Sequence, residues 1–316
     1  MTKFSFSQIN TWGKCNYQWH LKYVEGLMPP PTPAMSYGKL GHKMIENILR
    51  GEDIHHEIVI GEGEFDTGEI DEVQQLIEDV TASVRMFESS LPLSDWETVE
   101  LDGVPLIEFP VEVPIDDGDS YIGYIDWVAR HKPSGQVWLW DFKFRKSLQV
   151  DWVEEMDLQK PIYMKHVTDL GIDPIGTICG QIKSTAPKKP AMTKKGTLSK
   201  AKITTTWEIY RDTVIENGLD IADYEDMKDK LKDVEFIRLS RAFRTHEELQ
   251  RTWDTVFIRS VKQIKTQSTS FEPPPRSIGF MNCNNCKFRD ICIEDLKGRD
   301  TEDLKNQFQR REDYAA

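Results

Sequence analysis

Residues 121–144 decide the fold, and they read YIGYIDWVAR (121–130), HKPSGQ (131–136) and VWLWDFKF (137–144). The outer two segments are rich in β-branched and aromatic residues, which favour strands. The Pro-Ser-Gly between them favours a turn. The sequence therefore predicts a β-hairpin or meander here, preceded by further extended segments from about residue 98.

The predicted hairpin sorts its charged side chains, because successive residues of a strand point to opposite faces. Asp141 and Lys143 share one face of the second strand, and Asp126 on the first strand can join them. Two carboxylates and an ammonium suit Mg²⁺ or Mn²⁺, which prefer oxygen ligands. Other Asp-x-Lys triplets in the chain fall in predicted helices or tails, where a solvated charged face explains them. The aromatic strand around Asp141 sets this triplet apart.

Two pairs of polar residues lie four positions apart on predicted helices, so each pair shares a helix face. His42 and Glu46 form a pair that can bind a metal or act as a base, or can be structural. Gln159 and Tyr163 are neutral hydrogen-bonding groups that can meet phosphate or a base. Taken alone, both pairs fit an ordinary helix surface better.

The five cysteines argue against a disulfide framework, because their number is odd and no apolar secretory segment is visible. Cys283, Cys286 and Cys292 lie close together, and the distant Cys15 is the candidate fourth ligand of a metal site. Cys179 falls in an apolar strand and is expected to be inert. Zinc and an iron–sulfur cluster both accept four thiolates, and the spacing does not choose between them.

The composition is that of an ordinary soluble protein, with a net charge of −13 that is unevenly distributed. No apolar run reaches the roughly 18 residues that a membrane span needs. Between Pro174 and Trp207 there are seven lysines and no acidic residue. Residues 183–202 fit a solvated loop, whereas the nuclease resemblance set out below implies that their lysines contact DNA. The candidates are Lys188, Lys189, Lys194 and Lys195.

The remaining segments are assigned from periodicity and from proline and glycine positions. In the first part of the chain we expect a helix capped by Ser7 and ending near Gly26, a linker at 29–33, a helix ending at Gly51, and an acidic loop over 61–80 leading into a helix through Phe87. In the middle we expect a helix from Val153 to Leu170, a buried strand at 175–182 and a mobile loop at 183–202. Toward the end we expect a mostly helical region at 207–265 and a stiff linker at 272–277.

Together these motifs resemble the RecB-like branch of the PD-(D/E)XK nucleases. They are most similar to its iron–sulfur exonucleases, typified by the CRISPR-associated RecB-like exonucleases, the AddB nuclease domain and phage-encoded relatives. The resemblance extends from Ser5 to Cys292. It rests on the order of Cys15, His42 in G-x-x-x-H, Asp126 in GYID, Asp141-Phe142-Lys143, Gln159-x-x-x-Tyr163 and the cluster Cys283, Cys286 and Cys292.

The resemblance implies an α/β fold, in which a mixed central sheet is flanked by helices and an iron–sulfur lobe is built from both termini. It implies an N-terminal segment (1–33), a nuclease core (34–270) and a C-terminal cysteine segment with a charged tail (271–316). The lysine-rich stretch 183–202 and the helical region 207–265 exceed what the family core needs.

The resemblance also implies roles for single residues. Mg²⁺ or Mn²⁺ would be held by His42, Asp126, Asp141 and the carbonyl of Phe142, and Lys143 would position or activate the water. Gln159 and Tyr163 would contact the DNA strand, and Glu46 would be a supporting residue. Cys15, Cys283, Cys286 and Cys292 would hold a 4Fe–4S cluster, with zinc as the alternative.

The expected function is that of a cytoplasmic, metal-dependent DNA exonuclease acting on single strands or ends in recombination, repair or phage DNA processing. Three alternatives stay open. The first is a subunit that depends on a protein partner, such as a recombinase, a helicase or a CRISPR integrase. The second is a structure-specific endonuclease, and the third is a catalytically silent DNA-binding or redox protein. Cleavage polarity and oligomeric state are left undetermined.

Overall fold

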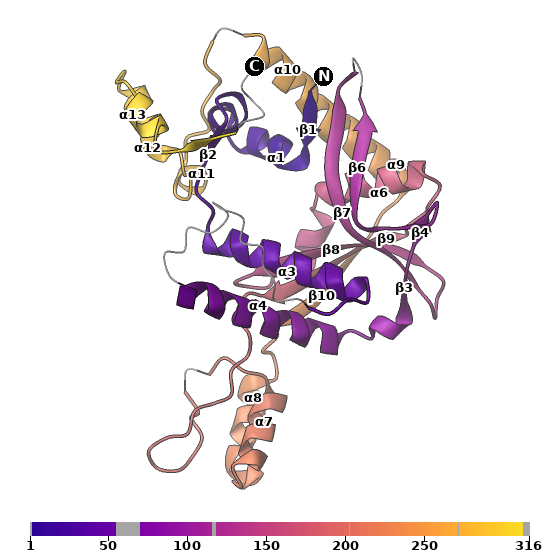
Figure 1. The fold of residues 1–316 in the computed structure, drawn as a ribbon, viewed down its shortest axis with the longest axis vertical. Helices are drawn as coiled ribbons and strands as arrows, with labels where there is room; N and C mark the ends of the chain where they lie inside the picture. The colour runs from indigo at the N-terminus through magenta and orange to yellow at the C-terminus, as the bar shows by residue number, and fades with distance from the viewer. Residues whose placement is uncertain (1, 55–69, 116–117, 202, 271, 312–316) are drawn as a thin grey trace.

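A mixed sheet of seven strands forms the centre of the molecule (Figure 1). The computed structural model describes residues 2–54, 70–115, 118–201, 203–270 and 272–311. The strand order is β1-β7-β8-β9-β10, and β3 and β6 also pair with β7. The strands are β1 (Lys3–Ser5), β3 (Trp96–Thr98), β6 (Ile107–Pro114), β7 (Ser120–His131), β8 (Val137–Arg145), β9 (Gly176–Lys183) and β10 (Ile237–Phe243).

The predicted hairpin is present as β7 and β8, which are antiparallel and joined by a tight turn. The turn contains Gly135 at a φ of 70°, a left-handed conformation that glycine adopts easily. β8 pairs in parallel with β9, and β9 pairs antiparallel with β10. The α/β fold with a mixed central sheet is therefore confirmed.

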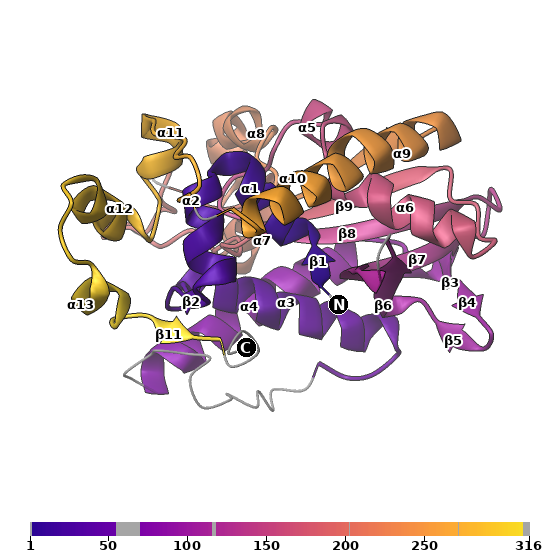
Figure 2. The same cartoon turned by 90° about the horizontal axis from the view of Figure 1, so that it is seen from above.

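Helices cover both faces of the sheet (Figures 1 and 2). α3 and α4 pack on the face that carries Trp140 and Phe142, and α1, α6 and α10 pack on the face that carries Leu139. These elements are α1 (Phe6–Lys14), α3 (Pro33–Leu49), α4 (Ile70–Ser90), α5 (Trp152–Glu155), α6 (Gln159–Asp169), α9 (His246–Thr252) and α10 (Arg259–Ser268), with the short turns η2 (Leu93–Asp95) and η5 (Trp253–Ile258). Every described helix is too short or too polar to cross a membrane.

The N-terminal segment differs from its prediction. The helix cap is Ser5 rather than Ser7, because the Ser5 side chain accepts a hydrogen bond from the backbone N–H of Gln8. The residues before it form β1, which pairs in parallel with β7. The predicted single helix is also interrupted at Cys15, whose backbone is extended, and it continues as α2 (Asn16–Trp19) and the wider turn η1 (His20–Val24).

The predicted helix from Val153 to Leu170 is instead two helices, α5 and α6. The side chain of Asp157 accepts hydrogen bonds from the backbone N–H groups of Gln159 and Lys160, and these bonds favour a new helix start at that point. The region 207–265 is mostly helical as expected, but it also contains β10, an edge strand whose partner β9 is distant in sequence.

Residues 184–236, here called the inserted lobe, project beyond α4 (Figure 1). The lobe contains α7 (Trp207–Glu216), η4 (Ile221–Tyr224) and α8 (Glu225–Leu231) around a small core of its own. The lysine-rich stretch is a loop over most of its length, as predicted, and contains a short hairpin in which Met192 pairs with Leu198. Lys202 lies outside the described residues.

The two ends of the chain meet in a terminal lobe, defined here as residues 15–28 and 275–311. Its strand pair joins β2 (Leu27–Met28) to β11 (Gln309–Arg310). The helices α11 (Phe280–Cys283), α12 (Arg289–Leu296) and α13 (Glu302–Lys305) complete it. A separate small hairpin consists of β4 (Glu100–Leu101) and β5 (Val104–Pro105).

Residues 61–69 of the predicted acidic loop lie outside the described residues, and residues 70–80 are helical rather than a loop. The helix after it already begins at Ile70 and runs to Ser90. The last residues of the predicted charged tail, 312–316, also lie outside the described ranges.

Candidate active site

The two candidate carboxylates lie where β7 and β8 separate. The paired register of these strands ends at Trp127 and Trp140, so Asp126 and Asp141 are the first residues beyond it. The backbone N–H of Phe142 donates a hydrogen bond to Oδ2 of Asp126 at 2.7 Å. The carboxylate thus takes the position of a strand partner, which fixes its orientation.

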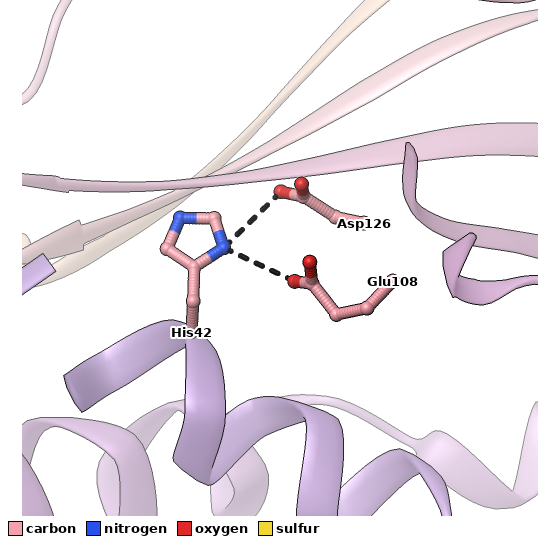
Figure 3. A group of neighbouring side chains, drawn as sticks. All are labelled: His42, Glu108 and Asp126. Carbon is pink, nitrogen blue, oxygen red and sulfur yellow. Dashed lines mark ion pairs between the residues drawn. The ribbon is translucent and has the colours of Figure 1, made fainter. Parts of the chain in front are cut away.

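His42 approaches Asp126 from α3 (Figure 3). Its Nδ1 lies 3.6 Å from Oδ2 of Asp126. The helix can come this close because residue 41 is glycine, and a Cβ there would overlap the ring of Phe144. The sequence pattern Gly-His on α3 therefore serves packing as well as placement of the imidazole.

Glu108 is a functional candidate that the sequence interpretation missed. Its Oε1 lies 3.5 Å from Nδ1 of His42, and it projects from β6 beside Asp126 (Figure 3). Its backbone has a φ of 47°, which is unusual for a residue other than glycine and is often found at functional sites. The only signal in the sequence was an acidic residue inside an apolar strand, LIEFPV.

His42, Glu108 and Asp126 form a possible metal-binding group, because one donor atom from each lies within 4.8 Å of the others. One imidazole nitrogen and two carboxylate oxygens are donors that divalent cations such as Mn²⁺ accept. Asp141 lies beside this group, and its oxygens pair with two lysines. Nζ of Lys143 is 2.6 Å from Oδ1, and Nζ of Lys160 is 3.5 Å from Oδ2.

The pKa values of the two aspartates are shifted in opposite directions. Burial and the nearby charge of Asp141 raise the pKa of Asp126 to about 6. Burial acts in the same direction on Asp141, but Lys143 and Lys160 outweigh it and lower the pKa of this carboxyl. Burial opposes the charge of Lys143, but the two aspartates outweigh it and raise its pKa. Lys143 is thus an ammonium that can donate hydrogen bonds and stabilise negative charge.

Cation binding at this group is expected to release protons and to strengthen as the pH rises. Burial favours neutral His42, but Glu108 and Asp126 outweigh it and raise the pKa of the imidazole. With a pKa of about 6 for Asp126, both groups carry protons in acid and must lose them to bind a metal. Calorimetric titration with Mn²⁺ in two buffers of different ionisation enthalpy measures this release. An affinity that stays flat from about pH 5 to about pH 7 would contradict the expectation.

Gln159 and Tyr163 do pair on α6, and the amide of Gln159 donates to the Tyr163 hydroxyl at 2.9 Å. Tyr163 is buried against Gly123 of β7, where a Cβ would collide with its hydroxyl. Gln159 is the more accessible of the two. Glu46 lies one turn from His42 and pairs with Lys43 and Arg50 on the surface of α3, at 2.9 and 3.0 Å.

The candidate DNA-binding lysines are all exposed and lie in the inserted lobe. Lys189 forms an ion pair with Glu216 at 2.6 Å. Lys194 and Lys195 occupy the tip of the hairpin, between the hydrogen-bonded Thr193 and Thr197. The hairpin belongs to the lobe that projects beyond α4, on the side of α4 away from α3 (Figure 1).

Cys15, Cys283, Cys286 and Cys292 line one pocket of about 270 Å³ in the terminal lobe. All four are free, half-buried thiols, and burial raises the pKa of Cys286 and Cys292. Cys179 lies elsewhere, buried in β9, where burial raises its thiol pKa strongly. The fold thus gathers the four cysteines that the sequence analysis grouped and leaves out the fifth.

The PD-(D/E)XK nuclease superfamily matches this chain over residues 3–293. Among solved structures, the chain is similar to a crystal structure from Eubacterium rectale, whose protein is provisionally named an exonuclease. The two are 12% identical with a TM-score of 0.48, over 92% of this chain and 91% of that one. No curated protein matches the sequence significantly. Because the family match spans nearly the whole of its length, the chain belongs to the PD-(D/E)XK nuclease superfamily.

Proposed function

We propose that this protein is a divalent-metal-dependent deoxyribonuclease of the RecB-like branch that degrades DNA from an end. The observation that carries the proposal is the convergence of His42, Glu108 and Asp126 beside the Asp141–Lys143 ion pair. This is a mixed nitrogen and oxygen donor set next to an ammonium, on a fold whose superfamily consists of nucleases.

The residues fit a Mg²⁺ or Mn²⁺ ion in number and in donor type. His42, Glu108 and Asp126 would hold it, with Asp141 and the Phe142 carbonyl as further donors. When bound, such an ion polarises a phosphodiester and lowers the pKa of a bound water. Lys143 would hold the attacking water or the developing negative charge through its Nζ protons, and Gln159 would contact the strand with its amide.

We also propose that Cys15, Cys283, Cys286 and Cys292 hold a 4Fe–4S cluster. Their thiols line one pocket. Four thiolates are the ligand set of a 4Fe–4S cluster, and a structural zinc ion takes the same set.

A cleavage assay with end-labelled linear and circular single-stranded DNA, in Mg²⁺ or Mn²⁺, tests the function. We expect linear DNA to be lost and circular DNA to persist, because a circle has no end. Cleavage of circles would instead indicate a structure-specific endonuclease. Inactivity of the cluster-loaded protein on both substrates would contradict the proposal and favour a partner-dependent subunit or a DNA-binding protein.

Replacing Lys194 and Lys195 with alanine is expected to flatten the salt dependence of DNA binding. Each phosphate contact contributes about 0.7 to the slope of log K against log salt for a single strand. The two side chains are exposed at the hairpin tip, where a DNA strand can reach them. Affinity measured over a range of salt concentrations gives the slope.

A matched control removes the same charge from the same lobe, as Lys228→Ala with Lys232→Ala in and beside α8. Both of these lysines are exposed, so their loss should cost no packing. If both double variants keep the wild-type slope, the hairpin does not contact the strand, and its lysines serve solubility alone.

A further inference from the structure

A buried lysine, Lys160, contacts Asp141 of the candidate active site. Lys160 is the second residue of α6 and is only 1% exposed. A buried ammonium costs several kcal/mol of folding free energy unless it is paired and hydrogen-bonded. Its Nζ lies 2.9 Å from Oε2 of Glu154, 3.2 Å from Oδ2 of Asp157 and 3.5 Å from Oδ2 of Asp141.

Glu154 anchors this lysine to the rest of the fold. It is 5% exposed, and its second oxygen, Oε1, accepts a hydrogen bond from the hydroxyl of Thr177 on β9 at 3.2 Å. The backbone carbonyl of Glu154 accepts a bond from Arg244, which follows β10. The Lys160–Glu154 pair is thus fixed to two strands of the sheet and to two helices.

The same pair holds one side of a candidate catalytic carboxylate. Oδ1 of Asp141 is taken by Lys143 from its own strand, while Oδ2 faces Lys160 and, at 3.9 Å, the thiol of Cys179. Both oxygens are therefore engaged by cations from different elements. Residues that form hydrogen bonds or ion pairs with a metal ligand set the ligand's orientation and the affinity for the ion.

We propose that Lys160, held in place by Glu154, is a positioning residue that orients Asp141 for metal binding; this inference rests on the proposed metal-dependent function. A purely structural role explains the geometry less well. A buried ion pair is weak evidence for stability, since apolar residues of similar volume often stabilise a fold as well or better. A Lys160–Glu154 pair that only stabilised the fold would not need the additional contact between Lys160 and Asp141.

The test is calorimetric titration of the cluster-loaded protein with Mn²⁺, comparing wild type with the double variant Lys160→Met, Glu154→Gln. Removing one positive and one negative charge together keeps the local net charge, so a change in affinity reports orientation. We expect Mn²⁺ binding to weaken by about tenfold or more, as for other residues that orient metal ligands. Unchanged affinity would overturn the inference, even if the melting temperature falls.

A matched control removes a partly buried pair elsewhere, as Lys305→Met with Glu25→Gln, whose atoms are 2.8 Å apart. Its Mn²⁺ affinity should equal that of wild type, and an equal loss in both variants would overturn the inference.

If the Lys160 variant does not fold, the single variant Glu154→Gln provides the test. Its amide oxygen can still accept from Thr177 but no longer forms an ion pair with Lys160, so Lys160 should lose its fixed position and Mn²⁺ affinity should fall. Unchanged affinity again overturns the inference. A wild type that binds no Mn²⁺ would overturn both this inference and the proposed function.

Discussion

Asp126→Asn is expected to abolish metal-dependent DNA cleavage, by about a thousandfold or more, without unfolding the protein. The carboxylate belongs to the group with His42 and Glu108, and an amide is a far weaker ligand for Mg²⁺ or Mn²⁺. A catalytic metal contributes several kcal/mol to transition-state stabilisation, and each 1.4 kcal/mol is a factor of ten in rate. The asparagine oxygen can still accept the hydrogen bond from the N–H of Phe142.

The direction in which Asp126→Asn changes the stability of the fold can be predicted. The folded protein raises the pKa of Asp126 to about 6, above the ordinary carboxyl value of about 4. Folding therefore favours the protonated form, and stability falls as the pH rises from about 4 to about 6. Above that pH the ionised carboxylate continues to destabilise the fold. Asparagine carries no charge, so we expect the melting temperature at pH 8 to equal or exceed that of wild type.

Rates with labelled linear DNA and thermal melting at pH 8 measure both effects. The matched control is Asp169→Asn, which removes the same charge from an exposed pair with Lys165 on α6. That control should cleave like wild type. Cleavage by Asp126→Asn within about tenfold of wild type would show that this group does not supply the catalytic metal.

Asp126 is a cleaner probe than Asp141, although both are candidates. Asp141→Asn would remove the ion-pair partner of Lys143 and one of the three carboxylates that surround the buried Lys160. Losing a carboxylate beside a buried ammonium destabilises the fold, because the charge is then less well compensated. Lost activity in that variant would therefore mix chemistry with folding.

The hairpin was predictable from the sequence because the alternation of a strand is strict. Once the turn at 131–136 is recognised, the faces of Asp126, Asp141 and Lys143 follow from counting by two. The pairing of Gln159 with Tyr163 follows in the same way from the period of a helix. These are local rules, and they needed no knowledge of how distant segments pack.

The missed residues depend on contacts between distant segments. Glu108 reaches His42 only because the backbone of β6 takes a positive φ at that residue, which no pattern in LIEFPV reveals. No pattern in the sequence marks Lys160, and its burial follows from the way α5 packs on β10. Such tertiary arrangements override local periodicity, so sequence reasoning could not place them.

Cys286→Ser is expected to remove the proposed iron–sulfur cluster and to loosen the terminal lobe. The lobe has a small core of Tyr17, Leu21, Leu27, Phe288 and Ile291, drawn from both ends of the chain. A core of that size contributes little stability on its own, so the metal group would supply much of what joins the two ends. We expect the visible absorption and roughly four iron atoms per chain of the wild type to be lost.

The matched control is Cys179→Ser, because that thiol is buried in β9, away from the pocket of the other four. It should keep its iron content, whereas Cys286→Ser should lose its iron and become sensitive to proteolysis after about residue 270. Full iron content in Cys286→Ser would contradict the four-thiol site. If the wild type is colourless and contains one zinc per chain after anaerobic purification, the four thiols hold zinc instead of a cluster.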